Sequence, residues 1–63
     1  MDANVRENVL RYIESALDMY GSEPSPYFLG IVKAAVSIAS MTGVIYMYEV
    51  RVFEESIDSV KNR

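Results

Sequence analysis

Residues 27–48 read YFLGIVKAAVSIASMTGVIYMY, a stretch of twenty-two residues that carries one charge, Lys33. The segments before and after this stretch are polar, with apolar residues at regular spacing. The way in which the stretch is buried decides the fold, because a run of this length and composition belongs either inside a helical bundle or inside a membrane. The flanking patterns help to separate these two possibilities.

A helix over residues 26–42 forms the first part of this stretch. Ser25 followed by Pro26 is typical of an N-cap and a first helical residue, and Gly43 is a typical stop. The polar positions of this helix share one narrow stripe on a helical wheel, formed by Gly30, Lys33, Ser37 and Ser40. The remaining arc is apolar and wide, so we expect other helices to cover it on more than one side.

An amphipathic helix over residues 2–20 precedes the stretch. Asp2 is a suitable N-cap, and Gly21 stands where a left-handed residue commonly ends a helix. Glu7 and Arg11 form an i,i+4 pair in the favourable order. Apolar residues follow spacings of three and four along one face, at Val5, Val9, Ile13, Ala16, Leu17 and Tyr20. The pattern predicts a helix with one face to bury.

Residues 44–62 contain two competing patterns. Their first part is rich in β-branched and aromatic residues, which alone favours a strand. A heptad seam nevertheless runs without a break through Tyr46, Val50, Phe53, Ile57 and Val60. No strand places these five residues on one face, so the sequence predicts a third helix with the seam, Tyr46 included, in the core.

The three helices predict an all-α fold, a small antiparallel three-helix bundle that forms one domain over residues 1–63. A loop at 21–25, rich in Pro, Gly and Ser, separates the first two helices. Similar helix lengths and short connections suit antiparallel packing. The alternative is a helical hairpin with one long helix over 26–62, because a glycine inside a helix costs only about 1 kcal/mol. Two such hairpins would form a dimeric four-helix bundle.

The size of the chain argues for association with another chain. A domain of 63 residues buries only about 60% of the surface that its unfolded form exposes, so its core needs a supplement. The chain has no Cys and no His, which excludes disulfides, the usual zinc sites and catalysis by Cys or His. Oligomerisation is the supplement that remains.

The charge and the N-terminus limit the possible partners and location. Nine acidic and six basic residues give a net charge of −3, and the basic residues form no cluster, so we expect no nucleic-acid binding. The N-terminus lacks the basic and then apolar run of a secretory signal. The absence of Cys fits a reducing compartment, and we expect a cytoplasmic location, with the membrane as the alternative. The initial Met favours a complete protein over an excised domain.

No residue pattern predicts catalysis, a cofactor or a metal site, and we expect no enzyme. The acidic residues Glu49, Glu54, Glu55 and Asp58 lie off the seam. Metal sites in helical bundles direct carboxylates inward and usually add a Glu-x-x-His element, which this chain lacks. Lys33 shares its stripe with serines and can extend its ammonium group to water, so Schiff-base chemistry is not expected.

The excess of apolar surface predicts a small helical interaction or assembly module. We expect a homodimer or higher homo-oligomer, or the binding of a partner protein helix, through the apolar face of helix 26–42 and the start of helix 44–62. Tyrosine and methionine at that start are enriched at protein interfaces. The candidate interface residues are Leu29, Val32, Val36, Met47, Tyr48 and Val52.

A single-pass membrane peptide that spans about residues 27–48 is the alternative function. A run of about twenty apolar residues spans a bilayer core, and tyrosines lie near both ends of this one. Against this, Lys33 near the helix centre costs roughly 2.5–3.5 kcal/mol on the insertion scale, and Gly43 indicates a helix end within the segment. The seam that starts at Tyr46 also favours the bundle.

Overall fold

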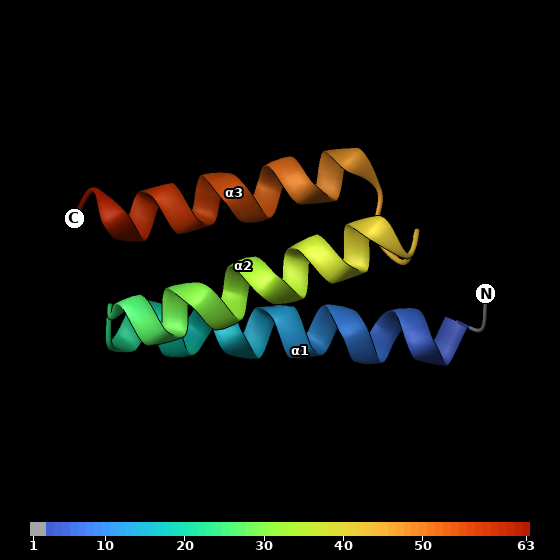
Figure 1. Cartoon of the computed structure of the whole chain (residues 1–63), viewed down its shortest axis with the longest axis horizontal. Coiled ribbons are helices and arrows are strands. Elements are labelled where there is room, and N and C mark those ends of the chain that lie inside the picture. Colours follow the sequence, from blue (N-terminus) through green and yellow to red (C-terminus); the bar gives the residue numbers. More distant parts are fainter. Residues whose placement is uncertain (1–2) are drawn as a thin grey trace.

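The computed structural model describes residues 3–63, which form three α-helices (Figure 1). The helices are α1 (Ala3–Ser22), α2 (Pro26–Met41) and α3 (Met47–Lys61). Successive helices run in opposite directions, so the start of α1 lies at the same end of the molecule as the α2–α3 turn. The predicted all-α, antiparallel three-helix bundle is confirmed. The predicted N-cap, Asp2, lies outside the described residues.

The first helix continues through Gly21, so the helix end predicted at that residue is wrong. Among residues 3–63 only Gly43 has a positive φ. Arg63 donates a hydrogen bond from Nη1 to the Gly21 carbonyl oxygen at 2.9 Å, which satisfies one of the acceptors left free at a helix end. The helix ends shortly before Pro24, because proline disfavours the helical conformation of the residue before it.

The second helix begins and ends where its local chemistry predicts. Ser25 Oγ accepts a hydrogen bond from the backbone N–H of Phe28 at 3.2 Å, and Pro26 occupies the first helical position. Gly43 has a φ of +74°, a left-handed conformation that glycine adopts without steric cost. This turn separates α2 from α3, so the alternative with one long helix over 26–62 is wrong.

The turn between α2 and α3 is longer and more buried than the sequence predicts. The third helix begins at Met47, not at residue 44. Val44 and Ile45 lie in the turn with buried side chains. Their backbone N–H groups both donate to the Ala39 carbonyl oxygen, at 2.9 and 3.4 Å. Burial of two β-branched side chains stabilises this turn against extension of α3, because each contributes apolar area to the core.

The heptad seam is correct except at its first residue. Tyr46 is the N-cap of α3 and 59% exposed, so its assignment to the core is wrong. The backbone at Tyr46 is extended, and a helical repeat therefore does not place its side chain. The later seam residues Phe53, Ile57 and Val60 are buried, and Val50 is half-buried.

The core takes residues from all three helices and from the α2–α3 turn. Its buried members are Ile13, Ala16, Tyr20, Val32, Val36, Ala39, Val44, Ile45, Phe53, Ile57 and Val60. Several large apolar side chains are left exposed, among them Tyr12, Ile38, Met41, Met47, Tyr48 and Val52. The stretch 27–48 is divided between two helices and a turn, and within residues 3–63 no helix has the length and apolarity needed to cross a membrane.

Candidate interaction surface

The three pairs of neighbouring helices enclose three surface grooves whose linings differ. The groove between α2 and α3 has a volume of about 380 Å³. Its lining residues are Lys33, Val36, Ser37, Glu54, Ile57, Asp58 and Lys61. Four of these seven side chains are charged, two of each sign. Such a groove is well solvated and has little to gain from contact with an apolar surface.

The groove between α1 and α3 is also polar. Its volume is about 700 Å³, and its lining residues are Leu17, Asp18, Gly21, Ser22, Ser56, Ser59, Val60 and Arg63. Arg63 closes one end of it, because its guanidinium is held on the Gly21 carbonyl oxygen. The lining also contains three hydroxyl groups, from Ser22, Ser56 and Ser59, and the carboxylate of Asp18.

The groove between α1 and α2 is apolar. It has a volume of about 280 Å³ and is lined by Asn8, Val9, Tyr12, Ile13, Ala35, Ile38, Ala39, Thr42 and Val44. None of these nine residues is charged, and seven of them are apolar. None comes from α3, so the groove opens on the side of the α1–α2 pair that α3 leaves uncovered.

Large side chains stand at the rims of the α1–α2 groove and small ones lie between them. Tyr12 of α1 and Ile38 of α2 are each 60% exposed. Ile13 and Ala39 are buried and form the floor, and Ala35 is half-buried beside them. The groove therefore combines projecting apolar side chains with a depression that another large side chain can enter, as in the packing of one helix against another.

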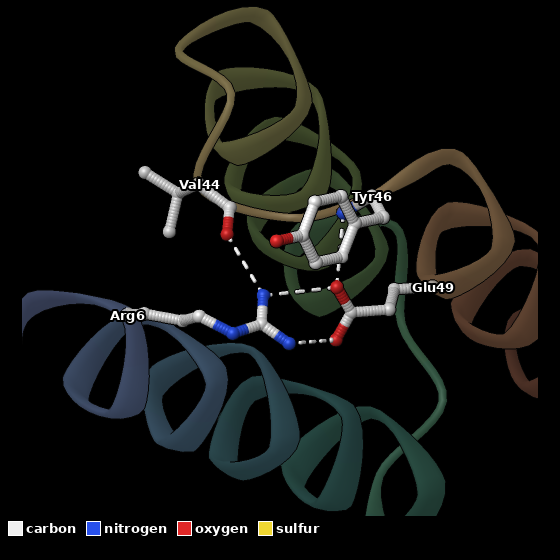
Figure 2. A network of polar contacts seen from close by, with 4 residues as sticks. All are labelled: Arg6, Val44, Tyr46 and Glu49. Atoms are coloured by element: carbon white, nitrogen blue, oxygen red, sulfur yellow. Dashed lines mark hydrogen bonds and ion pairs between the residues drawn. The ribbon is translucent and has the colours of Figure 1, made fainter. Parts of the chain in front are cut away.

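A network of polar contacts fixes the turn at the end of this groove (Figure 2). Arg6 binds both carboxylate oxygens of Glu49, from Nη1 to Oε1 at 2.9 Å and from Nη2 to Oε2 at 2.8 Å. Arg6 Nη1 also donates to the Val44 carbonyl oxygen at 2.9 Å. Glu49 Oε1 accepts the backbone N–H of Tyr46 at 2.9 Å. One side chain of α1 thus holds both the turn and the first residues of α3.

The Arg6 guanidinium also lies over the Tyr46 ring, 5.1 Å from its centroid, a cation–π distance. The Tyr46 ring stacks in turn on Tyr48, with centroids 5.9 Å apart and planes inclined by 14°. These contacts explain why Tyr46 is exposed although it continues an apolar pattern, since its ring covers an ion pair instead of entering the core.

The same contacts shift the ionisation of both charged groups. The hydrogen bonds from Arg6 lower the pKa of the Glu49 carboxyl, partial desolvation opposes them, and the Tyr46 N–H adds to the lowering. The hydrogen bond to Glu49 raises the pKa of Arg6. A carboxyl with a lowered pKa stabilises the fold at neutral pH, and that contribution is lost as the pH falls through its folded-state pKa.

The candidate interface residues predicted from the sequence divide into two groups. Val32 and Val36 are 0% and 6% exposed and belong to the core of the chain. Leu29 is half-buried and lines a shallow depression beside the α1–α2 loop. The members from α3 and its start, Met47, Tyr48 and Val52, are exposed and lie outside the apolar groove, so their contact role stays a prediction.

Tyr12 and Ile38 are not among the interface residues that the sequence predicts. The positions of both residues in their helical repeats indicate that they lie at the edge of a buried face. Val5, Tyr12 and Met19 are seven residues apart and therefore lie along one side of α1, at the edge of its buried face. Ile38 lies two residues from the buried Val36, on another part of the same wide apolar arc.

The residues considered for chemistry lie apart from the apolar groove. Glu49 is paired with Arg6, while Lys33, Glu54 and Asp58 line the α2–α3 groove. In residues 3–63 no group of three or more acidic, Cys or His side chains is arranged to hold a metal ion.

A comparison of the chain with protein families, with curated proteins and with solved structures finds no match in any of the three.

Proposed function

We propose that this chain is a small, non-catalytic helical assembly module that self-associates through the α1–α2 groove. The observation that supports this proposal is the contrast between the three grooves. The two that involve α3 carry charges and hydroxyl groups, while the α1–α2 groove has an uncharged lining with exposed Tyr12 and Ile38 at its rims. A concentrated apolar surface of this kind marks a site of protein association.

The small core supports the same proposal. The two side chains that are fully buried are of moderate size, Ile13 and Val32, and the core lies close to the minimum for a stable domain. Burial of the α1–α2 face against another chain adds apolar area at about 25 cal/mol per Å². Association therefore stabilises the fold as well as joining the copies.

The proposed contact surface excludes the start of α3, which the sequence predicts as part of the interface. Tyr48 and Val52 are exposed, but Tyr48 stacks on Tyr46 beside the charged pair of Arg6 and Glu49. Val52 has Glu49 and Glu55 as helical neighbours, three residues before and three residues after it. Charged neighbours of this kind belong to the rim of an interface, not to its desolvated centre.

Sedimentation equilibrium over a range of concentrations tests the proposal with a matched pair of variants. Ile38 and Val52 are 60% and 55% exposed, so a glutamate at either position leaves the fold intact. We expect the unmodified chain and Val52→Glu to associate, and Ile38→Glu to remain monomeric with unchanged helical circular dichroism. Dissociation by Val52→Glu alone would place the contact on α3. An unmodified chain that stays monomeric at every concentration would contradict the proposal.

A further inference from the structure

We propose that two copies of this chain complete the α1–α2 groove for each other in a two-fold arrangement, with α1 of each copy on α2 of the other. In this arrangement Tyr12 of one copy enters the depression beside Ala35 and Ala39 of its partner. The inference rests on the proposed function and adds to it the occupant of the groove and the pairing of the helices. The site is incomplete in one chain, because its large side chains border a depression that they do not fill.

The shape of the face carries the inference. Val5, Tyr12 and Met19 form a ridge along α1, with spacings of seven residues and exposed side chains. Across the groove, α2 carries small residues four apart, the half-buried Ala35 and the buried Ala39, which let another helix approach closely. A ridge and a row of small residues on the same face make that face self-complementary, as an interface between identical copies requires.

The positions of large and small residues distinguish between two possible two-fold axes. If the axis is parallel to the helices, α1 lies antiparallel on the partner's α2 with no shift along the helix axis. Tyr12 then lies opposite the small residues of the partner's α2. If the axis crosses the helices at the level of the groove, Tyr12 meets Tyr12 and Ala35 meets Ala35. Both arrangements give a four-helix core in which neighbouring helices are antiparallel. Only the first places large side chains against small ones, so the structure favours it.

The charges permit this contact between two chains that each carry a net charge of −3. The lining of the groove has no charged residue, and the one charge of α2, Lys33, lies in the other groove. Two copies therefore meet without like charges opposite each other at the centre of the contact. Face-to-face contact through the α2–α3 groove would instead desolvate two carboxylates and two lysines from each copy.

The face formed by α1 and α2 is of the same order of size as a standard dimer interface. A standard interface buries about 800 Å² per copy, roughly a fifth of the 4372 Å² that the chain exposes. The helices α1 and α2 have 20 and 16 residues. At about 1.5 Å per residue and about 10 Å of width each, they present a face of about 500 Å² in projection, before the relief of the side chains is added. A contact of the standard class therefore needs the whole of this face together with its side-chain relief.

Disulfide pairing between two single-cysteine variants tests the arrangement, because the chain has no cysteine of its own. Asn8 and Thr42 both line the groove. Asn8 lies one helical turn from Tyr12, and Thr42 lies one turn from Ile38, both towards the end of the molecule that holds the α2–α3 turn. Replacing Asn8 and Thr42 therefore leaves the large side chains of the groove in place. Asn8→Cys and Thr42→Cys chains are mixed, allowed to exchange and oxidised, and the disulfides are identified by mass spectrometry.

We expect the mixed disulfide between Asn8→Cys and Thr42→Cys to exceed either homodisulfide by about tenfold, since a disulfide requires Cα atoms within about 7 Å. A matched control pairs Asn8→Cys with Ser59→Cys, which lines the α1–α3 groove, and is expected to give no mixed product.

The outcomes separate this inference from the proposed function. Homodisulfides of Asn8→Cys in excess would show α1 packed on α1 and would overturn the pairing, while association through the groove stands. An associated chain that forms none of these disulfides would also overturn it. A chain that sedimentation shows to be monomeric contradicts both the pairing and the proposed function.

Discussion

The apolar α1–α2 groove and the charged α2–α3 groove share one helix, and their difference comes from the two sides of that helix. α2 directs Ala35 and Ile38 to the first groove and Lys33 and Ser37 to the second. The narrow polar stripe of α2 thus faces α3 and water, and its wide apolar arc extends beyond what α1 covers. One short helix can therefore contribute both to the core of its own chain and to a surface that another chain completes.

The largest effect is expected from a charge at Val36, two residues from Ile38. Val36 is 6% exposed and borders the α2–α3 groove, so Val36→Glu removes a buried apolar side chain and brings a carboxylate into the core or forces it out into that groove. We expect a loss of more than about 4 kcal/mol, comparable to the whole stability of so small a domain. Circular dichroism should then show no cooperative thermal transition. Ile38→Glu is the matched control, and a folded Val36→Glu chain would show that this part of α2 is not core.

The next effect concerns the rim of the apolar groove. Tyr12→Ala removes a large, rigid side chain from the centre of the proposed contact, and we expect the dimer dissociation constant to rise about 10- to 100-fold. Tyr27→Ala is the matched control, because Tyr27 is also exposed but does not line the groove. Sedimentation equilibrium measures both. Equal effects of the two variants would mean that the groove has no special part in association.

A smaller effect on the stability of the fold is expected at two glycines, one within α2 and one in the turn that follows it. The expected change has opposite sign at the two positions. Gly43 has a φ of +74° and Gly30 lies within α2, and an added Cβ meets no atom within 4 Å at either position. Gly43→Ala is expected to destabilise the fold by about 1–2 kcal/mol, and Gly30→Ala to stabilise it by about 1 kcal/mol. Thermal unfolding measures both shifts. A neutral Gly43→Ala would mean that the turn adapts without strain.

The smallest effect is the pH dependence that Glu49 contributes. Its lowered pKa means that protonation weakens the fold, so the melting temperature should fall as the pH drops below about 4.5, the usual value for this carboxyl. Glu49→Gln should lower the melting temperature at pH 7 by a few degrees and reduce this acid dependence. Glu55→Gln is the control, on the exposed side of α3. An acid profile that is unchanged in Glu49→Gln would remove the Arg6 pair from the account.

Local chemistry allowed the sequence to predict much of the fold. Ser25 and Pro26 begin a helix and Gly43 ends one because caps and left-handed turns depend on a few neighbouring residues. Two local signals gave wrong predictions for tertiary reasons. Gly21 stays helical while its carbonyl binds a residue 42 positions away. Tyr46 leaves the seam while two residues before it are buried in a turn.

The candidate surface was harder to predict than the fold. A helical wheel shows that α2 has a wide apolar arc, but it does not show which part faces α1, which faces α3 and which remains exposed. Val32, Val36 and Ile38 are equivalent in the sequence, yet the first two are buried and the third is exposed. The difference depends on where α1 and α3 pack against α2, and long-range contacts such as that between Arg6 and Glu49, 43 residues apart, are not visible on a helical wheel.

Methyl NMR over a dilution series tests whether copies of this chain associate through the α1–α2 groove. The methyl groups of Ala35 and Ile38 lie in the groove, and those of Val52 lie on α3 outside it. We expect the resonances of Ala35 and Ile38 to move with concentration, along one monomer–dimer curve, and that of Val52 to stay fixed. Movement of the Val52 resonances without those of Ile38, or no movement at any concentration, would contradict association through this groove.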